Sequence, residues 1–163
     1  MTIFDKCHAF EDAKRVIEMG YYPYFKVISS EQDTEVIVNG KKMLMMGSNS
    51  YLGLTNHPKV KEAAIEAVKK YGSGCAGSRF LNGTLDIHIE LEERLAKLVG
   101  KDSALAYATG YQANVGAISA VVGKNDVVIT DKLDHASIID GCLMSYGKML
   151  RYNHKDMDSL EKI

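Results

Sequence analysis

Cysteine is scarce in this sequence, and its copies stand far apart. Cys7, Cys75 and Cys142 are odd in number and form no CxxC pair, so the sequence predicts neither a disulfide framework nor a zinc site. Long hydrophobic runs are also lacking, because no apolar stretch approaches the roughly 20 residues of a membrane span. The N-terminal stretch MTIFDKCHAFEDAKR carries charges where a signal peptide needs apolar residues. We therefore expect no transmembrane segment, and the cytoplasm as the default compartment.

Charge of one sign is not in excess. The net charge is −1 over 163 residues, with acidic and basic side chains interspersed, so there is neither a basic stripe nor an acidic tail. We expect no nucleic-acid partner. Hydrophobic residues make up 46% and charged residues 25%, the mixture of a soluble globular domain that is long enough to bury a core. Internal repeats and low-complexity segments are absent.

The first part of the chain predicts an arm followed by a β-hairpin. Residues 1–30 predict a helix, with Phe10 and Ile17 on one apolar face and Gly20 at its end, and then an irregular stretch. Residues 34–46 predict a hairpin, because Asn39-Gly40 is the pair that best accepts positive φ in a type I′ turn. We assign residues 1–57 to an N-terminal arm and hairpin.

From Pro58 onward helices and strands alternate, and we assign residues 58–163 to a second domain. The expected elements are helices opening at Pro58 and Asp86, a strand at 104–108, a helix at about 111–122, a strand at 127–130, a helix at about 136–146 and a strand at 149–152. The second helix should face inward through Ile87, Leu91, Leu95 and Leu98. Strand–helix–strand units of this length imply parallel strands with right-handed crossovers, so the fold class is α/β.

Two predicted strands lead into turns that carry candidate ligand-binding residues. Thr109, Gly110 and Tyr111 open a helix, where free N–H groups and the positive helix end favour a phosphate. The alternative is a tight turn that binds nothing. His135 follows the next strand, at the sheet edge where doubly wound folds bind ligands. It can stack on a planar ligand, bind an anion or move a proton, or it is a solvated or helix-capping residue.

A glycine-rich stretch, GSGCAGSRFLNGT at residues 72–84, joins the two helices before these turns. Arg79 could pair there with a carboxylate or phosphate, and Ser78 adds a hydroxyl. The alternative is a flexible loop, although its length favours a function. Asn49 and Tyr51 lie in a further loop after the hairpin, as turn residues or contacts to a partner subunit. His88 is expected to be structural, and no metal-ligand spacing is visible.

Taken in order, the motifs SNSYLGL, GSGCAGSRFLNGT, ATGYQAN and DHASIIDG resemble the α-oxoamine synthases. These are fold-type I enzymes that use pyridoxal 5′-phosphate (PLP) to condense an amino acid with an acyl-CoA, with loss of CO₂. GSRFLNGT, TGYQAN and HASIIDGC are most similar to the bacterial serine palmitoyltransferase branch, which serves sphingolipid biosynthesis. The 2-amino-3-ketobutyrate CoA ligases and the 8-amino-7-oxononanoate synthases remain alternatives.

The resemblance implies a role for each candidate. Gly110 and Tyr111 would hold the PLP phosphate, and His135 would stack on the pyridine ring as the catalytic residue and help to position the amino-acid carboxylate. The remaining candidates would lie near the substrate or the interface of a homodimer: Asn49, Tyr51, Ser78 and Arg79. The substrates would be L-serine and an acyl-CoA, and the product a 3-keto amine. Residues 58–163 would be the N-terminal half of the PLP-binding large domain.

The resemblance also implies that half of an active site is missing. The family's Schiff-base lysine and its pyridine-nitrogen aspartate lie in the second half of a longer chain, and no lysine here has the expected Ser/Thr-rich context. We therefore expect the 163-residue chain alone to be inactive. It is a piece of a full enzyme, a natural remnant, or a non-catalytic interaction module. Such a chain should leave the sheet edge and apolar helix faces exposed, and we expect it to dimerise, swap segments or pack unusually to cover them.

Overall fold

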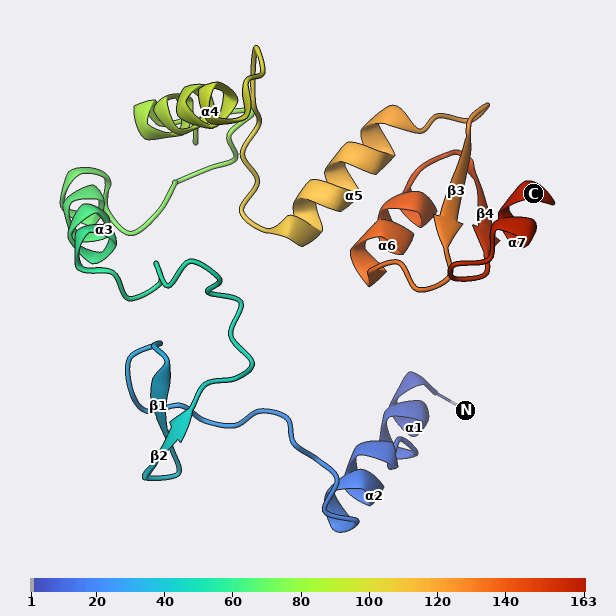
Figure 1. The fold of residues 1–163 in the computed structure, drawn as a ribbon, viewed down its shortest axis with the longest axis horizontal. Coiled ribbons are helices and arrows are strands. Elements are labelled where there is room, and N and C mark those ends of the chain that lie inside the picture. Colours follow the sequence, from blue (N-terminus) through green and yellow to red (C-terminus); the bar gives the residue numbers. More distant parts are fainter. Residues whose placement is uncertain (1) are drawn as a thin grey trace. The chain divides into compact units, whose positions relative to one another are not determined.

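The structure, a computed structural model, describes residues 2–163, so Met1 of the predicted arm lies outside the described residues. The chain divides into two compact units, one ending at Gly74 and the other running from Cys75 to Ile163, and each is described here by itself (Figure 1). Helices, an antiparallel hairpin and a parallel strand pair confirm the predicted α/β class. None of the described helices is both long and apolar enough to cross a membrane.

The N-terminal arm contains two short helices where the sequence predicts one. Helix α1 covers Ile3–His8 and α2 covers Asp12–Glu18, so the placement of Phe10 on a helical face is wrong. The reason is local capping. Thr2 caps the start of α1, and Ala9 is the C-cap at its end. A second helix, α2, then begins with the acidic residue Asp12 in its first turn. Gly20 follows the end of α2, as predicted, and has a left-handed conformation with φ of 74°.

The predicted hairpin is confirmed. Strand β1 (Glu35–Val38) pairs antiparallel with β2 (Lys41–Leu44), in a register that places Val38 opposite Lys41. The two turn residues have φ of 51° at Asn39 and 73° at Gly40, as a type I′ turn requires. Helix α3 (Pro58–Tyr71) ends this unit and begins at the predicted proline, with His57 accepting a hydrogen bond from the Lys59 amide as its N-cap.

In the second unit, helix α4 runs over Asp86–Val99 and stops at Gly100, which is left-handed. Its bounds match the prediction, but its apolar stripe does not face inward, since Leu91 is 46% and Leu98 80% exposed. The predicted strand at 104–108 is also wrong. The amide of Ala106 donates to the Glu92 carboxylate instead of to a strand, and within residues 2–163 no strand pairs with this segment.

The rest of this unit is a helix followed by a strand–helix–strand unit. Helix α5 (Gly110–Val121) leads to β3 (Val127–Asp131), and α6 (Ala136–Met144) crosses to β4 (Lys148–Tyr152), which pairs in parallel with β3 as predicted. A last short helix, α7, covers Met157–Glu161. Figure 1 shows α5 and α6 side by side. They approach closely at Gly141, where a Cβ would lie 3.1 Å from the Asn114 carbonyl oxygen.

Few apolar side chains are enclosed by the described residues. The buried ones are Val36, Ala96 and Cys142. Large apolar side chains on α3 and α4 stay open to solvent, such as Val68 at 57% and Val99 at 62% exposure. The predicted exposure of apolar helix faces is therefore confirmed, whereas self-association stays a prediction.

Candidate functional site

The first predicted turn forms the N-terminus of α5. Thr109 is the N-cap, and its hydroxyl accepts a hydrogen bond of 3.1 Å from the Gln112 amide. Within the described part of the chain, no acceptor contacts the amides of Gly110 and Tyr111. A Cβ built on Gly110 would meet nothing within 4 Å, so the space beside this first residue of the helix is open. Free amides at the positive end of a helix suit an anion.

The second predicted turn forms the N-terminus of α6. His135 is the N-cap, with Nδ1 3.2 Å from the Ser137 amide and 2.7 Å from the Ser137 hydroxyl. The helix-capping alternative is thus realised. The residue as a whole is nevertheless exposed, and its capping bonds use Nδ1, which leaves Nε2 without a hydrogen bond among the described residues. Capping and contact with a ligand are compatible roles for this histidine.

Side chains on α5 and α6 link the two turns. The Tyr111 hydroxyl donates to the Asp140 carboxylate across 2.9 Å, which raises the pKa of Tyr111. The Asn114 side-chain amide donates to the Ser137 hydroxyl, also across 2.9 Å. Because both bonds lie near the N-termini of their helices, they hold the phosphate-turn candidates and His135 in one region of the second unit.

The glycine-rich loop is fastened to α4 by one ion pair. Arg79 donates through Nη1 and Nη2 to the two oxygens of Glu92, at 2.5 and 3.0 Å. These bonds, with the Ala106 amide at 2.8 Å, lower the pKa of Glu92 from 4.5 to about 2. The guanidinium is therefore already paired with a carboxylate of this chain. Its assignment to the substrate or dimer interface stays a prediction.

The loop is also closely folded on itself. The Ser78 carbonyl accepts the Gly83 amide at 2.8 Å, and the Thr84 hydroxyl donates to the Arg79 carbonyl at 2.6 Å. A Cβ on Gly83 would overlap the Gly77 carbonyl. These contacts describe an ordered turn and disfavour the flexible-loop alternative. The Ser78 side chain is exposed, so its predicted contact with a substrate or partner stays a prediction.

His88 has the structural role that the sequence favours. It lies on α4, and its Nδ1 accepts the Leu85 amide at 3.0 Å, at the start of the helix. Its Nε2 lies 4.0 Å from the Cys75 sulfur. Two other histidines also act locally, since His57 caps α3 and His154 lies 2.9 Å from the Asp131 carboxylate.

Asn49 and Tyr51 belong to the first unit, in the turn that follows the hairpin. The Tyr51 amide donates to the Asn49 carbonyl at 2.9 Å, and the Tyr51 side chain is 88% exposed. The two residues thus occupy an open turn. Their predicted position near a dimer interface stays a prediction.

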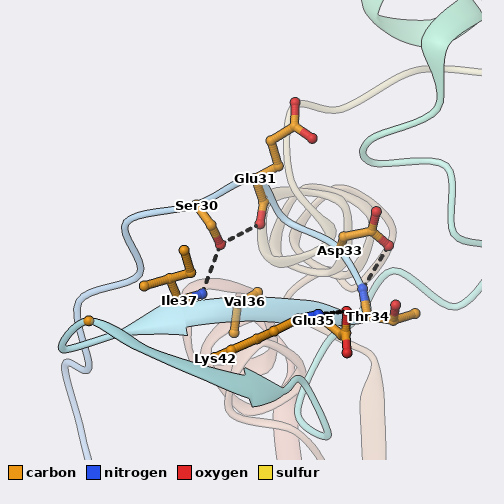
Figure 2. A pocket seen from close by; sticks show the side chains of 9 residues that line it. Ser30, Glu31, Asp33, Thr34, Glu35, Val36, Ile37 and Lys42 are labelled. Atoms are coloured by element: carbon orange, nitrogen blue, oxygen red, sulfur yellow. Dashed lines mark hydrogen bonds and ion pairs between the residues drawn. The ribbon is translucent and has the colours of Figure 1, made fainter.

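The first unit also has a polar cavity of about 440 Å³ beside the hairpin, shown in Figure 2. Its polar groups already bind one another: the Ser30 hydroxyl accepts the Ile37 amide at 3.0 Å, and Lys42 pairs with Glu35 at 2.6 Å. None of the candidate residues lines it. We do not assign it a ligand.

Sequence reasoning missed the partners of the candidate residues. Four of these partners were given no role in the sequence analysis: Glu92, Asn114, Ser137 and Asp140. Helical spacing carried a usable signal, because Asn114 lies one turn after Tyr111, and Asp140 one turn after Ser137. Each helix thus presents two polar side chains on one face near its N-terminus. The pairing between the helices could not be read from spacing alone.

Comparisons with known proteins point to one family. Residues 41–163 match the family model for aminotransferase class I and II. A serine palmitoyltransferase from Sphingobacterium spiritivorum is 59% identical over 141 residues, which cover 86% of this chain and 35% of that protein. An 8-amino-7-oxononanoate synthase from Geobacter sulfurreducens is 44% identical over 152 residues, 93% of this chain and 39% of that protein. The chain thus spans well under half the length of these relatives.

Solved structures agree with this result. A serine palmitoyltransferase from S. paucimobilis with a bound PLP–myriocin aldimine has a TM-score of 0.91 and 35% identity, covering 99% of this chain and 42% of that one. Sphingomonas wittichii serine palmitoyltransferase has a TM-score of 0.90 and 35% identity, covering 99% and 41%. On the family model and these similarities, the chain belongs to the aminotransferase class I and II family, as a member similar to the α-oxoamine synthases.

Proposed function

We propose that this chain is the N-terminal part of a PLP-dependent acyltransferase that condenses an amino acid, L-serine in preference, with an acyl-CoA. The reaction loses CO₂ and yields a 3-keto amine. The observation that carries the proposal is the pair of helix N-termini joined by side-chain bonds, Tyr111 to Asp140 and Asn114 to Ser137. The 59% identity to a serine palmitoyltransferase favours serine over other amino acids.

The residues of the second unit fit PLP. The open space beside Gly110 and the free amides of Gly110 and Tyr111 suit its phosphate, which carries negative charge to the positive end of α5. When bound, PLP supplies an electron sink for a carbanion at the α-carbon of the amino acid. The ring of His135, an exposed residue, can lie against the pyridine ring, and its Nε2 remains available to orient the amino-acid carboxylate.

The remaining parts of the proposal rest on the resemblance. Asn49, Tyr51, Ser78 and Arg79 would contribute to the interface of a homodimer or to a substrate contact. We expect the Schiff-base lysine and the pyridine-nitrogen aspartate in the part of the relatives that this chain does not span. The 163-residue chain would then be inactive alone, and the cytoplasm remains the proposed compartment. The proposed domains are an arm and hairpin at 1–57 and half of the PLP-binding domain at 58–163.

A second candidate function is 8-amino-7-oxononanoate synthesis, because a relative of that name is 44% identical over nearly the same range. Both candidates predict PLP and an acyl thioester, and they differ in the amino acid and the acyl group. A glycine C-acetyltransferase of the 2-amino-3-ketobutyrate type is a third possibility from the sequence motifs. The motifs of the glycine-rich loop and of the α5–α6 region, GSRFLNGT, TGYQAN and HASIIDGC, are most similar to the serine palmitoyltransferase branch and favour the first candidate over the other two.

Product analysis of the full-length protein tests the proposal. The protein is incubated with L-serine, glycine or L-alanine and a series of acyl-CoA lengths, and products are identified by mass spectrometry. A 3-keto amine from serine and a long-chain acyl-CoA is the expected result. A preference for glycine or L-alanine over L-serine would replace the proposed function by one of the other two candidates. Absence of any condensation product would overturn the class of reaction.

A binding experiment tests the phosphate turn separately. Gly110→Val adds a branched side chain to the first residue of α5, next to its free amides, and we expect PLP affinity to fall at least about tenfold because the side chain crowds the approach of the phosphate to these amides. Ala117→Val adds the same kind of side chain to an exposed position on the same helix and should leave affinity unchanged. Equal PLP affinity of both variants would contradict the assignment of the phosphate to this turn.

A further inference from the structure

Ser137 is the most enclosed polar side chain among the described residues, at 1% exposure, and it lies between two functional groups. Its hydroxyl is 2.7 Å from His135 Nδ1 on one side and 2.9 Å from Asn114 Nδ2 on the other. A hydroxyl has one proton to donate and two lone pairs to accept. The three side chains therefore form a chain of hydrogen bonds whose direction can be worked out.

The direction follows from the donor at one end. A side-chain amide nitrogen only donates, so the Ser137 oxygen accepts from Asn114. The Ser137 hydroxyl proton is then free for His135 Nδ1. The Ser137 backbone amide, 3.2 Å from the same nitrogen, also donates to it. Nδ1 thus meets two donors and must act as an acceptor, which leaves the proton of the neutral imidazole on Nε2.

We propose that Asn114 and Ser137 are positioning residues that hold the neutral His135 ring in its Nε2–H tautomer and fix its orientation. The role of this tautomer rests on the proposed function: an Nε2–H that no described residue accepts is a donor for the carboxylate of an amino-acid substrate. A ring with the opposite tautomer would present a lone pair there and repel the carboxylate. We call the hydrogen-bonded series Asn114–Ser137–His135 the relay. It leads from the contact between α5 and α6 to the His135 ring, against which the substrate would lie.

Asn114→Asp tests the direction of the relay, because a carboxylate accepts where the amide donated. The Ser137 hydroxyl would then donate to Asp, and its oxygen would face Nδ1 as an acceptor. We expect the tautomer balance of His135 to move from Nε2–H alone towards a mixture with some Nδ1–H, limited by the Ser137 backbone amide, which still donates to Nδ1. Long-range proton–nitrogen NMR on the cofactor-free full-length protein, labelled with ¹⁵N at histidine, measures the two ring nitrogens directly. The His135 signal is assigned by its loss in His135→Gln.

Two further variants serve as a graded comparison and as a control. Asn114→Ala removes the donor without reversing it, and should shift the balance less than Asn114→Asp. Ser119→Ala removes a hydroxyl from the same helix that bonds only to the Val115 and Gly116 carbonyls, and should leave His135 unchanged. An Nδ1–H ring in the wild-type protein, or identical His135 signals in wild type and Asn114→Asp, would overturn the proposal.

The consequence for the reaction has its own readout. In the active full-length protein, we expect Asn114→Asp to raise KM for the amino acid about fivefold to tenfold, the loss of roughly one hydrogen bond, with KM for acyl-CoA unchanged. Ser119→Ala should alter neither constant. The NMR result does not depend on PLP or on any substrate. A confirmed tautomer shift in a protein that makes no condensation product would therefore refute the proposed function and leave the relay standing.

Discussion

Arg79 and Glu92 meet through two hydrogen bonds, and the same carboxylate accepts the amide of Ala106. Glu92 therefore connects three segments of the second unit: the part of the glycine-rich loop around Arg79, helix α4, and the stretch around Ala106 before α5. The Glu92 side chain is only 13% exposed, and Nε of Arg79 is buried without a partner among the described residues. An arrangement that depends on one carboxylate should be sensitive to its removal.

Glu92→Gln is expected to loosen the glycine-rich loop. A neutral amide can keep only one acceptor oxygen for Arg79 or Ala106, so the two-point pairing is lost. We expect faster amide exchange and faster proteolytic cleavage between residues 72 and 84. Glu90→Gln is the matched control, because Glu90 lies on the same helix and its pair with Arg94 is exposed at the surface. Equal protection of the loop in both variants would contradict the role given to Glu92.

The same ion pair predicts a pH dependence of stability. The pKa of Glu92 falls from 4.5 to about 2 in the folded chain, chiefly because Arg79 and the Ala106 amide stabilise the carboxylate. A lowered pKa means that the stabilisation is complete above pH 4.5 and is lost as the pH falls towards 2.

Thermal unfolding from pH 6 to about 2 measures this effect, since it shows whether the Tm of the wild type converges on that of Glu92→Gln. Asp131 also has a lowered pKa, held by the Leu133 amide and His154, so both proteins should retain a common slope. The difference between the two proteins isolates Glu92. A constant difference in Tm over this range would show that the Glu92 charge makes no contribution.

The sequence predicted elements well where the signal was local. Asn39-Gly40 specified a type I′ turn by its backbone preference alone, and Pro58 marked the start of α3. The strand at 104–108 failed because a strand exists only through a partner, and the Ala106 amide is bonded to a side chain. The inward face of α4 failed for a related reason, since few described side chains cover Leu98.

For the candidate site, sequence motifs identified the two turns but not what joins them. Residues such as Asn114 and Ser137 are ordinary helix residues by composition, and their importance comes from a contact between residues 23 positions apart. Such a contact depends on how α5 and α6 pack, which in turn depends on the close approach at Gly141. Periodicity reports faces of single helices and contains no information on which faces meet.

Two glycines of the loop should respond differently to the same substitution by alanine. Gly83→Ala would place a Cβ on the Gly77 carbonyl, and backbone cannot move aside cheaply. We expect a loss of about 1–3 kcal/mol in the free energy of unfolding, as for other overpacked positions. Gly74→Ala has nothing within 4 Å and no positive φ, and should be neutral or slightly stabilising. Urea unfolding measures the free energy of unfolding of both variants. Equal changes in this free energy would contradict the close packing of the loop.

The bond between Tyr111 and Asp140 predicts energetic coupling between the two helices. Tyr111→Phe keeps the ring and the backbone amide but removes the hydroxyl that donates to Asp140 across 2.9 Å. Asp140→Ala removes the acceptor. If the bond contributes to the α5–α6 contact, the second substitution should lower the Tm less when the first is already present. Thermal unfolding of the four proteins in this cycle measures the coupling.

Tyr111→Phe paired with Asp134→Ala serves as the control cycle, because the Asp134 carboxylate accepts the Asp131 amide and does not bond to Tyr111. Additive effects are expected there. Since Tyr111 is half exposed, at 49%, the coupling should be modest and detectable mainly as non-additivity. Additivity in both cycles would show that the Tyr111–Asp140 bond does not couple the two helices energetically, and would contradict the role given to it in the α5–α6 contact.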